Sequence, residues 1–349
     1  MSFNKKIGAW YALNKRKLPW RETQDPYRIW LSEIILQQTR VAQGTPYYLR
    51  FVAAFPTVRH LAAATEEEVL KLWQGLGYYS RARNLHAAAK MVVDEHRGQF
   101  PKTYKSLLAL KGVGDYTASA VASICFNEAQ AVLDGNVYRV LARYHGVELP
   151  INSTAGTKYF RALAQEVMDR ENARDYNQGL MEFGALQCTP KNPDCAKCPL
   201  QDGCVALRDG TVGVLPVKIK KNKVRKRYFN YLVPVRKDGD GHMRTVLRQR
   251  TGKGIWQGLW EFPLLESDRE LQQPEVALGA KQVLAVKHTP QPHLYNEKQV
   301  VHKLSHQHLY TKFWPVPINE ALPNEIKGED LHRYPVPVLI ADFIKTFKF

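Results

Sequence analysis

SLLALKGVGDYTASAVASICF, residues 106–126, predicts two helices joined by a tight turn. An apolar helical segment leads into KGVG, and a second helix of small residues begins near Asp115. Gly112 and Gly114 leave backbone N–H groups bare at the start of that helix, where a phosphate binds without any base being read. The segment therefore favours a sequence-independent grip on DNA, although a G-x-G turn alone also fits two packed helices.

The charge of the whole chain favours the same partner. Fifty Lys and Arg residues stand against 33 Asp and Glu residues in 349, a formal net charge of +17. This surplus draws a protein to a polyanion, with nucleic acid first and an anionic membrane surface second. No apolar run approaches the roughly 18 residues of a membrane span, and residues 1–20 lack a signal-peptide core. We expect a cytoplasmic protein.

The pattern of the chain changes after about residue 200. Before it, apolar residues recur at helical spacing between short Gly and Pro breaks. After it, seven basic residues lie between Lys218 and Arg227. This segment is either a linker that runs along DNA phosphates or a linker that is only solvated. YFNYLVPVRKDGDGHMRTVLRQR then reads as two strands around an Asp-Gly turn. The predicted regions are 1–212, a linker at 213–227 and an α+β domain at 228–349.

Four of the five cysteines fall within residues 188–204, separated by gaps of six, two and five residues. In a reducing interior such clusters are more often metal ligands than disulfides. Zinc sites usually have two tight pairs of cysteines, and only one pair is tight here. The spacing favours an iron-sulfur cluster over zinc and leaves both open. The candidate ligands are Cys188, Cys195, Cys198 and Cys204.

Three features together resemble the helix-hairpin-helix DNA glycosylases of the endonuclease III superfamily. They are LKGVGDYTA at 110–118, VLDGNVYRVLAR at 132–143 and the four cysteines. The resemblance covers roughly residues 5 to 205. It implies an all-α helix-hairpin-helix glycosylase core, a loop at 186–204 that holds a [4Fe-4S] cluster rather than zinc, and a flipped-out nucleotide beside Asp134.

Further segments resemble the MutY family of adenine DNA glycosylases within that superfamily. They are LPWRE at 18–22, WLSEIILQQTRV at 30–41, GLGYYSRARNL at 75–85 and GIWQGLWEFP at 254–263, the last in a Nudix-like (MutT-like) domain. The resemblance implies a monofunctional enzyme that removes adenine mispaired with 8-oxoguanine or guanine in double-stranded DNA. We expect a monomer associated with the nucleoid of a bacterial cell.

The resemblance assigns two carboxylates to the chemistry. Glu33 would protonate adenine N7, and Asp134 would face the oxocarbenium-like sugar. Glu33 lies in a strongly apolar segment, where burial would raise its pKa toward neutrality. Residue spacing alone favours a surface glutamate at 33 and a helix N-cap at 134. Tyr116 replaces the lysine of the bifunctional relatives and cannot form an imine, and Asn136 would assist Asp134 through its amide.

One departure from the relatives concerns trapping of the product. Some members of the MutY family carry lysine where this chain has Tyr138. We expect less adventitious cross-linking to DNA and unaltered base excision.

Other residues would contact DNA by the same resemblance. Gln37 and Tyr78 would enter the base stack beside the vacated adenine or the orphaned guanine lesion, and Arg21 would lie near the adenine pocket. Glu33 and Gln37 are four apart, so one helical face can present both. Core packing is the alternative for Tyr78. Stack insertion would offset part of the few kcal/mol that base extrusion costs.

The C-terminal domain carries two further expectations. A working Nudix box needs paired acids on a helix, and RELQQPE from Arg269 has glutamines there, so nucleotide hydrolysis is not expected. The family senses 8-oxoguanine with a Phe-Ser-His loop, which here would be Leu304, Ser305 and His306. Leu304 in place of phenylalanine keeps an apolar side chain that can wedge into DNA but cannot stack as a ring does, so lesion discrimination by this loop is expected to be weaker. The alternative is a strand turn with surface histidines.

Two other functions remain as alternatives from the sequence. A bifunctional glycosylase/lyase for oxidised pyrimidines is disfavoured by Tyr116 and by the extra domain. A noncatalytic iron-sulfur DNA-binding protein would leave Glu33 and Asp134 with structural roles only.

Overall fold

A computed structural model describes residues 1–219, 224–296 and 298–349. The chain divides into two compact units. Unit 1 comprises Met1–Ala63 and Asn84–Lys220, and unit 2 comprises Ala64–Arg83 and Lys221–Phe349. Part of the predicted linker, residues 220–223, lies outside the described residues. The predicted limits 1–212, 213–227 and 228–349 stay a prediction.

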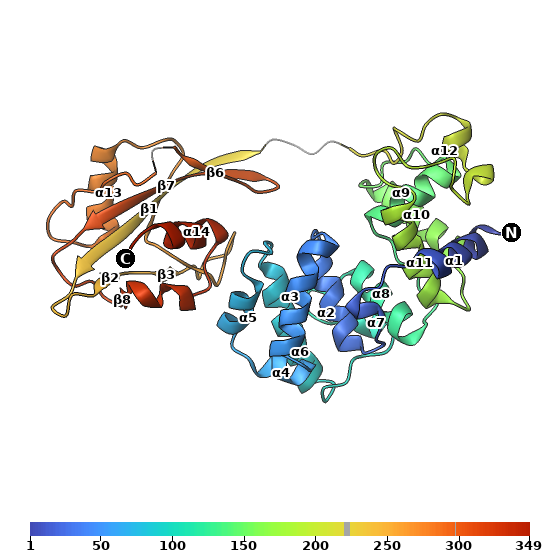
Figure 1. The fold of residues 1–349 in the computed structure, drawn as a ribbon, viewed down its shortest axis with the longest axis horizontal. Coiled ribbons are helices and arrows are strands. Elements are labelled where there is room, and N and C mark those ends of the chain that lie inside the picture. Colours follow the sequence, from blue (N-terminus) through green and yellow to red (C-terminus); the bar gives the residue numbers. More distant parts are fainter. Residues whose placement is uncertain (220–223, 297) are drawn as a thin grey trace. The chain divides into compact units, whose positions relative to one another are not determined.

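Unit 1 is helical, as the sequence predicts (Figure 1). The short 3-10 helices η1 (Pro19–Arg21) and η2 (Gln201–Gly203) lie between its α-helices. Those helices are α1 (Phe3–Asn14), α2 (Pro26–Leu36), α3 (Val41–Ala54), α4 (Val58–Ala63), α6 (Ser80–Asp94, whose first turn belongs to unit 2), α7 (Tyr104–Leu107), α8 (Asp115–Phe126), α9 (Gly135–His145), α10 (Thr154–Val167), α11 (Ala173–Leu186) and α12 (Val205–Arg208).

Local signals place the two helices that carry the predicted carboxylates. The Asp25 side chain accepts a 3.0 Å hydrogen bond from Tyr27 N at the start of α2, with Pro26 as its first residue. Asp134 caps α9 in the same way. Gly146 ends α9 in the left-handed conformation, which glycine adopts without strain. Both N-caps were predicted.

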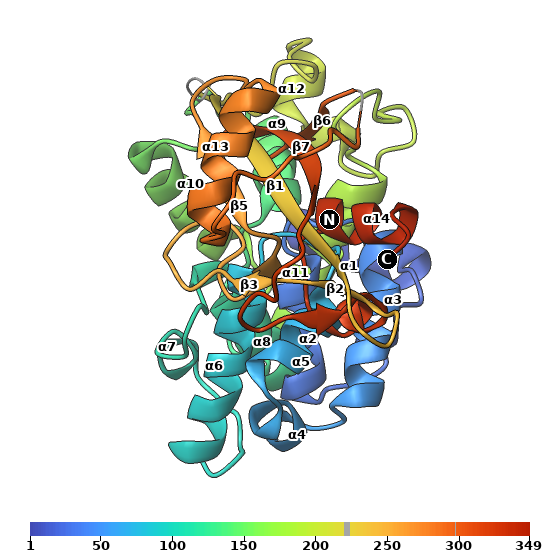
Figure 2. The same ribbon diagram turned by 90° about the vertical axis from the view of Figure 1, so that its left-hand side faces the viewer.

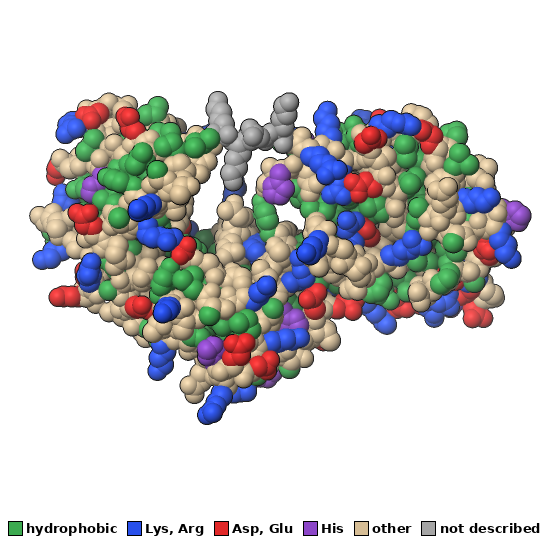
Figure 3. Space-filling view, turned by 180° about the vertical axis from the view of Figure 1, so that it is seen from behind, with side chains coloured by type: hydrophobic (Ala, Val, Ile, Leu, Met, Phe, Trp, Pro, Cys, Tyr) green, Lys and Arg blue, Asp and Glu red, His purple; other side chains and the backbone are tan. Residues whose placement is uncertain are grey.

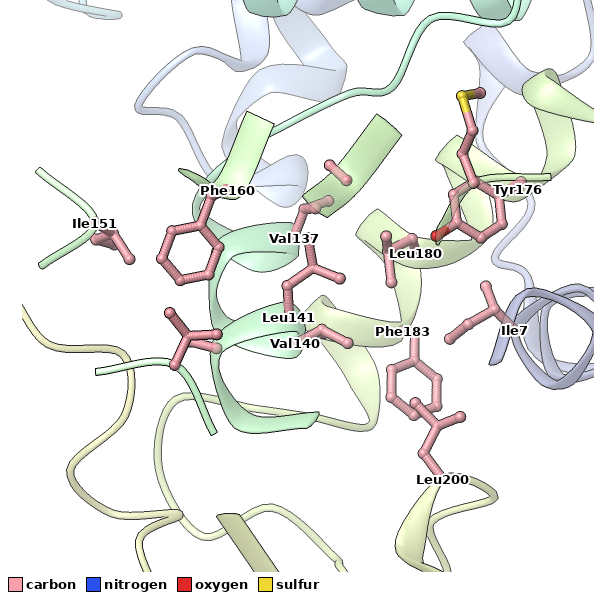
Figure 4. Packing of buried hydrophobic residues seen from close by; sticks show 14 of the residues in the cluster. Ile7, Val137, Val140, Leu141, Ile151, Phe160, Tyr176, Leu180, Phe183 and Leu200 are labelled. Carbon is pink, nitrogen blue, oxygen red and sulfur yellow. The ribbon is translucent and has the colours of Figure 1, made fainter. Parts of the chain in front are cut away.

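One core of unit 1 lies between α1, α9, α10 and α11 (Figure 4). Val137, Val140 and Leu141 follow helical spacing on α9 and are at most 1% exposed. Phe160 from α10 and Phe183 from α11 pack against this face. Burial of each such side chain stabilises the fold by roughly 1.5–3 kcal/mol. The core fixes the start of α9, and therefore the position of Asp134.

The predicted hairpin between α7 and α8 is confirmed. Gly112 has φ +73°, and a Cβ at this position would lie 2.5 Å from Asn84 Cβ. Only glycine fits both the backbone and the contact. Gly114 is the N-cap residue of α8, which begins at Asp115 as predicted.

Unit 2 is an α+β unit, as predicted. Its main sheet has the order β6-β7-β1-β2-β8, with β5 also paired to β1. The predicted hairpin at the start of the domain is present as the antiparallel pair β1 and β2, and β1 already begins at Arg225. The elements are α5 (Glu66–Trp73), β1 (Arg225–Lys237), β2 (Met243–Thr245), β3 (Arg248–Gln249), β4 (Trp260–Glu261), β5 (Leu264–Ser267), α13 (Gln273–Leu284), β6 (Val300–Lys303), β7 (Gln307–Pro317), β8 (Ile326–Lys327), η3 (Gly328–Arg333) and α14 (Val338–Thr346).

Helices cover both faces of the central strands β1 and β7, which run parallel (Figure 2). Adjacent side chains of β7 point to opposite faces of the sheet. Phe313 stacks on Phe343 of α14 with ring centroids 4.2 Å apart. Trp314 packs with Val276 of α13 in a separate apolar cluster. Helix α13 carries one acid, Glu275, in place of the paired acids of a Nudix box.

The surface carries basic and acidic side chains together. Lys and Arg side chains are spread over the face drawn in Figure 3, with Asp and Glu side chains between them. Among the residues that the structure describes, no helix is both long and apolar enough to cross a bilayer.

Candidate active site

A cavity of about 210 Å³ in unit 1 brings together the predicted catalytic side chains. Helices α2, α8, α9 and α11 contribute to its wall. Its lining residues are Arg16, Leu18, Trp20, Arg21, Ile29, Glu33, Leu36, Thr39, Val41, Tyr116, Ile124, Asp134, Asn136, Gln178, Met181, Glu182 and Ala185.

Glu33 is the buried acid of this cavity. Glu33 lies inside α2, whose residues from Tyr27 to Ile35 are nearly all buried. Glu33 itself is 8% exposed. The pKa of Glu33 is raised to about 7, chiefly by burial and in smaller part by the nearby Asp134 charge. The Tyr116 hydroxyl donates a 2.5 Å hydrogen bond to Glu33 Oε2, which opposes this shift. The predicted upward shift toward neutrality is thus present, and the role of Glu33 as the acid stays a prediction.

Asp134 is both a helix cap and a cavity residue. One carboxylate oxygen accepts hydrogen bonds from Asn136 N at 2.8 Å and Val137 N at 2.7 Å. The other accepts from Asn136 Nδ2 at 2.8 Å. Burial raises the pKa of Asp134, while these donors hold it back. The two readings from the sequence are therefore compatible, because capping aims the carboxylate into the cavity.

Arg139 joins this carboxylate to the cysteine loop. Its Nη2 donates to Asn136 Oδ1 at 2.9 Å and to Gly184 O at 2.6 Å. Its Nε donates to Cys188 O at 2.7 Å. Three hydrogen bonds from one buried guanidinium fix Asn136 and the first cysteine relative to each other. The sequence analysis did not identify Arg139.

Glu182 is a second carboxylate of the cavity that the sequence analysis missed. It is 1% exposed and lies on α11. Arg21 forms a two-pronged contact with it at 2.8 and 2.9 Å, and Arg16 donates to both of its oxygens. Burial raises the pKa of Glu182, but the two arginines outweigh this and hold it at about 2. A lone acid in the apolar run NQGLMEFGAL is the same signal that marked Glu33.

Gln37 does not continue the helical face of Glu33. Helix α2 ends at Leu36, and Gln37 has φ −55° and ψ 118°, outside the helical region. The expectation that one helical face presents both side chains is therefore wrong. Gln37 Nε2 instead donates to Thr117 Oγ1 of α8 at 3.2 Å. Gln37 is not among the residues that line the cavity.

The predicted lesion residues lie in unit 2. Ser305 and His306 are exposed in the turn between β6 and β7, which Leu304 N closes with a 2.9 Å hydrogen bond to Gln307 O. Tyr78 is 50% exposed, with a left-handed backbone at φ +47°. Its hydroxyl is hydrogen bonded to the Ser305 hydroxyl. Core packing of Tyr78 does not fit this exposure.

The four clustered cysteines follow α11 in one loop, and none of them forms a disulfide. Cys188 and Cys198 pack against the core of unit 1. The buried Arg143 donates to Cys188 Sγ at 3.4 Å and to Thr189 O at 2.8 Å. The same guanidinium donates to Leu215 O at 3.1 Å, beyond the last cysteine. Unit 1 thus holds both ends of the loop.

These four thiols are a ligand set for an iron-sulfur cluster, because a [4Fe-4S] cluster is held by four cysteine thiolates. Its ligands would be the four loop cysteines, and when bound it would cross-link the loop.

Three families match this chain. The HhH-GPD superfamily of base excision DNA repair proteins matches residues 31–188, and a NUDIX domain matches residues 232–346. The iron-sulfur binding domain of endonuclease III matches residues 188–204. The match over the cysteine loop supports the [4Fe-4S] cofactor that the spacing of the cysteines favours.

Similar proteins cover both units. The adenine DNA glycosylase of Mus musculus is 33% identical over 92% of this chain and 71% of its own length. That of Buchnera aphidicola (strain Sg) is 35% identical over 75% of this chain and 74% of its own length.

Solved structures match part of the chain. A thermostable thymine-DNA glycosylase has a TM-score of 0.55 at 31% identity, over 59% of this chain and 95% of its own. A trapped endonuclease III–DNA covalent intermediate has a TM-score of 0.52 at 21% identity, over 59% of this chain and 94% of its own. At that identity the second likeness shows the fold alone.

Proposed function

Because this chain belongs to the family of adenine DNA glycosylases, we propose that it hydrolyses the N-glycosidic bond of adenine mispaired with 8-oxoguanine or guanine in double-stranded DNA. The product would be an abasic site and free adenine. The observation that carries the proposal is the pair of carboxyl groups, Glu33 and Asp134, in one cavity, with the Tyr116 hydroxyl of α8 hydrogen bonded to Glu33.

The reaction needs an acid and a stabilised cation, and the cavity supplies candidates for both. Glu33, with a pKa of about 7, would donate its proton to adenine N7 as the C1′–N9 bond breaks. The Asp134 carboxylate would face the sugar cation, oriented by the backbone N–H groups of α9 and by Asn136. Water then adds to C1′ and returns a proton to the glutamate.

Glu182 and Arg21 would recognise the base. Their side chains form a planar ion pair on the cavity wall at 2.8 and 2.9 Å. A carboxylate can accept from the exocyclic amine of adenine, and a guanidinium can donate to a ring nitrogen. Tyr116 has no amine, so the proposed reaction is hydrolysis without strand cleavage.

A duplex panel tests the activity. Adenine opposite 8-oxoguanine, guanine, cytosine or thymine is incubated with cluster-loaded protein, and free base and nicking are scored separately. We expect free adenine from the first two duplexes and nicking only after alkali. Glu33→Gln should abolish the release of adenine. Glu95 is an exposed acid just after α6, and Glu95→Gln should leave the release unchanged. Nicking without alkali would instead support the glycosylase/lyase, and an intact 8-oxoguanine duplex would leave only a DNA-binding protein.

Lesion recognition would use the Tyr78–Ser305 contact. Both side chains are accessible. The Tyr78 ring can enter a base stack, and the two hydrogen-bonded hydroxyl groups beside it can contact the edge of a base. Ser305→Ala should lower the ratio of excision rates for adenine opposite 8-oxoguanine and opposite guanine. An unchanged ratio would leave this turn without a part in discrimination.

We further infer a monomer that works at the bacterial nucleoid, as its net charge of +17 favours attraction to DNA. Light scattering of the cluster-loaded protein at increasing concentration checks the first point. Imaging of a fluorescent fusion beside a DNA stain checks the second.

A further inference from the structure

A second cavity, of about 200 Å³, shares one wall residue with the candidate active site. Tyr116 lines both cavities. Its hydroxyl is bonded to Glu33 on the catalytic side. The rest of the second cavity is made by α7, α8, α9, α10 and the segment before Asp134, all within unit 1 (Figure 1). None of these other residues lines the catalytic cavity.

A hydroxyl group lines this second cavity. Ser119 is 4% exposed and follows Tyr116 by one turn of α8. A serine hydroxyl can both donate and accept, so it can form a hydrogen bond with a ligand in the cavity. The rings of Tyr104 and Tyr138 line the same cavity and offer flat apolar surfaces.

An ion pair marks the rim of the cavity. Arg161 Nη2 contacts Asp115 Oδ2 at 2.7 Å, and the Tyr104 hydroxyl donates to the other oxygen at 2.5 Å. Asp115 is thus satisfied by its neighbours, and the Tyr104 bond is the largest cause that lowers its pKa. Arg161 keeps further N–H donors for a ligand, since a guanidinium has five.

A wider hollow adjoins this rim. It has a volume of about 450 Å³ and shares Thr157 and Arg161 with the second cavity. It lies at the N-terminus of α10, a helix of 14 residues capped by Ser153. Lys158 lines it, and no acidic side chain does. Free N–H groups at a helix start and a lysine attract a phosphate.

We propose that these two hollows form one binding site for a 5′-phosphorylated nucleoside, named here the second nucleotide site. The base would lie beside Tyr104 and Tyr138 and bond to Ser119, and the phosphate would lie at Lys158 and the start of α10. A cavity of about 200 Å³ far exceeds the roughly 30 Å³ of one water molecule. The same volume is below the roughly 300 Å³ at which pockets for drug-sized ligands begin. The cavity is therefore of a size for one nucleobase.

The nucleotide can come from two sources that share this chemistry. It is either a free deoxynucleotide or one nucleotide of a bound DNA strand. In both cases the occupant contacts the Tyr116 side chain that donates to Glu33, so the site adjoins the proposed chemistry without taking part in it.

Photochemical labelling tests the site. Cluster-loaded protein is irradiated with 8-azido-2′-deoxyadenosine 5′-monophosphate, and labelled peptides are mapped by mass spectrometry. We expect label on Tyr104, Ser119 or Tyr138 or within residues 152–165, competed by unmodified dAMP and partly by inorganic phosphate. Label confined to peptides that carry only catalytic-cavity residues, or no competed label, overturns the proposal.

Three variants locate the bound nucleotide. Ala164→Leu fills the second cavity and should weaken labelling about tenfold, the equivalent of about 1.4 kcal/mol. Lys158→Ala, an exposed change that leaves the core intact, should weaken labelling and remove the competition by phosphate. Ser123→Ala is the matched control, because its hydroxyl bonds to Ser119 O within α8 and lines neither hollow. Equal labelling of all four proteins overturns the proposal.

An uncleavable duplex separates the two sources. Its addition before irradiation should abolish labelling at the second nucleotide site if a nucleotide of the DNA strand occupies it. Labelling that persists with duplex bound identifies a free nucleotide as the ligand. Both results support the chemistry, and neither depends on adenine being the excised base.

Discussion

The Tyr116 hydroxyl donates a 2.5 Å hydrogen bond to Glu33 Oε2 in the candidate active site. This bond and burial act on the glutamate in opposite directions. Burial raises the pKa of Glu33 and the bond lowers it, because a donor favours the ionised form, and the net pKa is about 7. The Tyr116 hydroxyl therefore lowers the pKa of the proposed acid, an effect that a variant can measure.

Tyr116→Phe should move the pH dependence of excision upward. Without the donor, the pKa of Glu33 rises further, so the protonated acid persists to higher pH. Single-turnover excision measured across neutral pH checks this, and the decline on the alkaline side should occur at higher pH in the variant. Tyr27→Phe, which removes a buried hydroxyl bonded to Phe55 O, is the control. A decline at the same pH in both variants contradicts the prediction.

Glu33→Gln should change how stability depends on pH. The folded-state pKa of about 7 lies above the ordinary 4.5, so the folded state binds the extra proton. The protonated glutamate therefore contributes stability fully below pH 4.5, and this is lost as pH rises through 7. The loss amounts to about 3 kcal/mol, from 1.36 kcal/mol per pKa unit.

Urea unfolding of both proteins at several pH values measures this effect. Relative to Glu33→Gln, the native protein should lose stability between pH 4.5 and neutrality. Taking the difference between the two proteins cancels the contributions of the other titrating groups that they share. A difference that stays constant with pH would show that Glu33 titrates normally.

Residues whose surroundings are local could be predicted from the sequence. The apolar residues beside Glu33 are its own neighbours in α2, and Asp134 caps the helix that it begins. The hairpin glycine is equally local, because its left-handed φ is a property of the turn itself. The four cysteines were recognisable because their ligand spacing lies within 17 residues.

Residues whose roles come from distant partners could not be predicted. Glu182 receives its arginines from 161 and 166 positions away, and Arg139 reaches Cys188 across 49 positions. No periodic pattern reports such pairings. The Gln37 error has a different cause, because helix propensity does not reveal that α2 ends one residue earlier, at Leu36.

Glu182→Gln should destabilise unit 1 and alter its response to acid. The change leaves two arginines without their buried counter-charge, at a cost of roughly 3 kcal/mol. The folded pKa of Glu182, about 2, lies below the ordinary 4.5, so its contribution is present above 4.5 and lost as pH falls toward 2. Thermal unfolding at neutral and acidic pH should therefore show a larger deficit at neutral pH. Equal deficits at both values contradict this.

Arg139→Lys should impair both the catalytic cavity and the cysteine loop. Lysine keeps the charge but cannot donate to Asn136, Gly184 and Cys188 together. Single-turnover excision should fall by about tenfold or more, as expected for loss of roughly 1.5–3 kcal/mol of charge-assisted hydrogen bonding. The visible absorbance of the cluster should also be lost faster in the presence of a chelator.

The exposed Arg170→Lys is the matched control for this change. It keeps excision and cluster retention at native values if the effect belongs to the buried contacts. If Arg139→Lys keeps native excision and native cluster retention, the contacts of Arg139 support neither the cavity nor the loop, and the prediction is contradicted.

Gly112→Ala should destabilise the hairpin, whereas Gly114→Ala should not. Gly112 has φ +73°, and its added Cβ would lie 2.5 Å from Asn84 Cβ, so strain and contact together should cost about 1–3 kcal/mol. Gly114 has φ −97° and no atom within 4 Å of an added Cβ, so its replacement should cost under about 1 kcal/mol. Urea unfolding of both variants, with affinity for an undamaged duplex measured beside it, should show the larger loss for Gly112→Ala. Equal losses would place the constraint elsewhere in the turn.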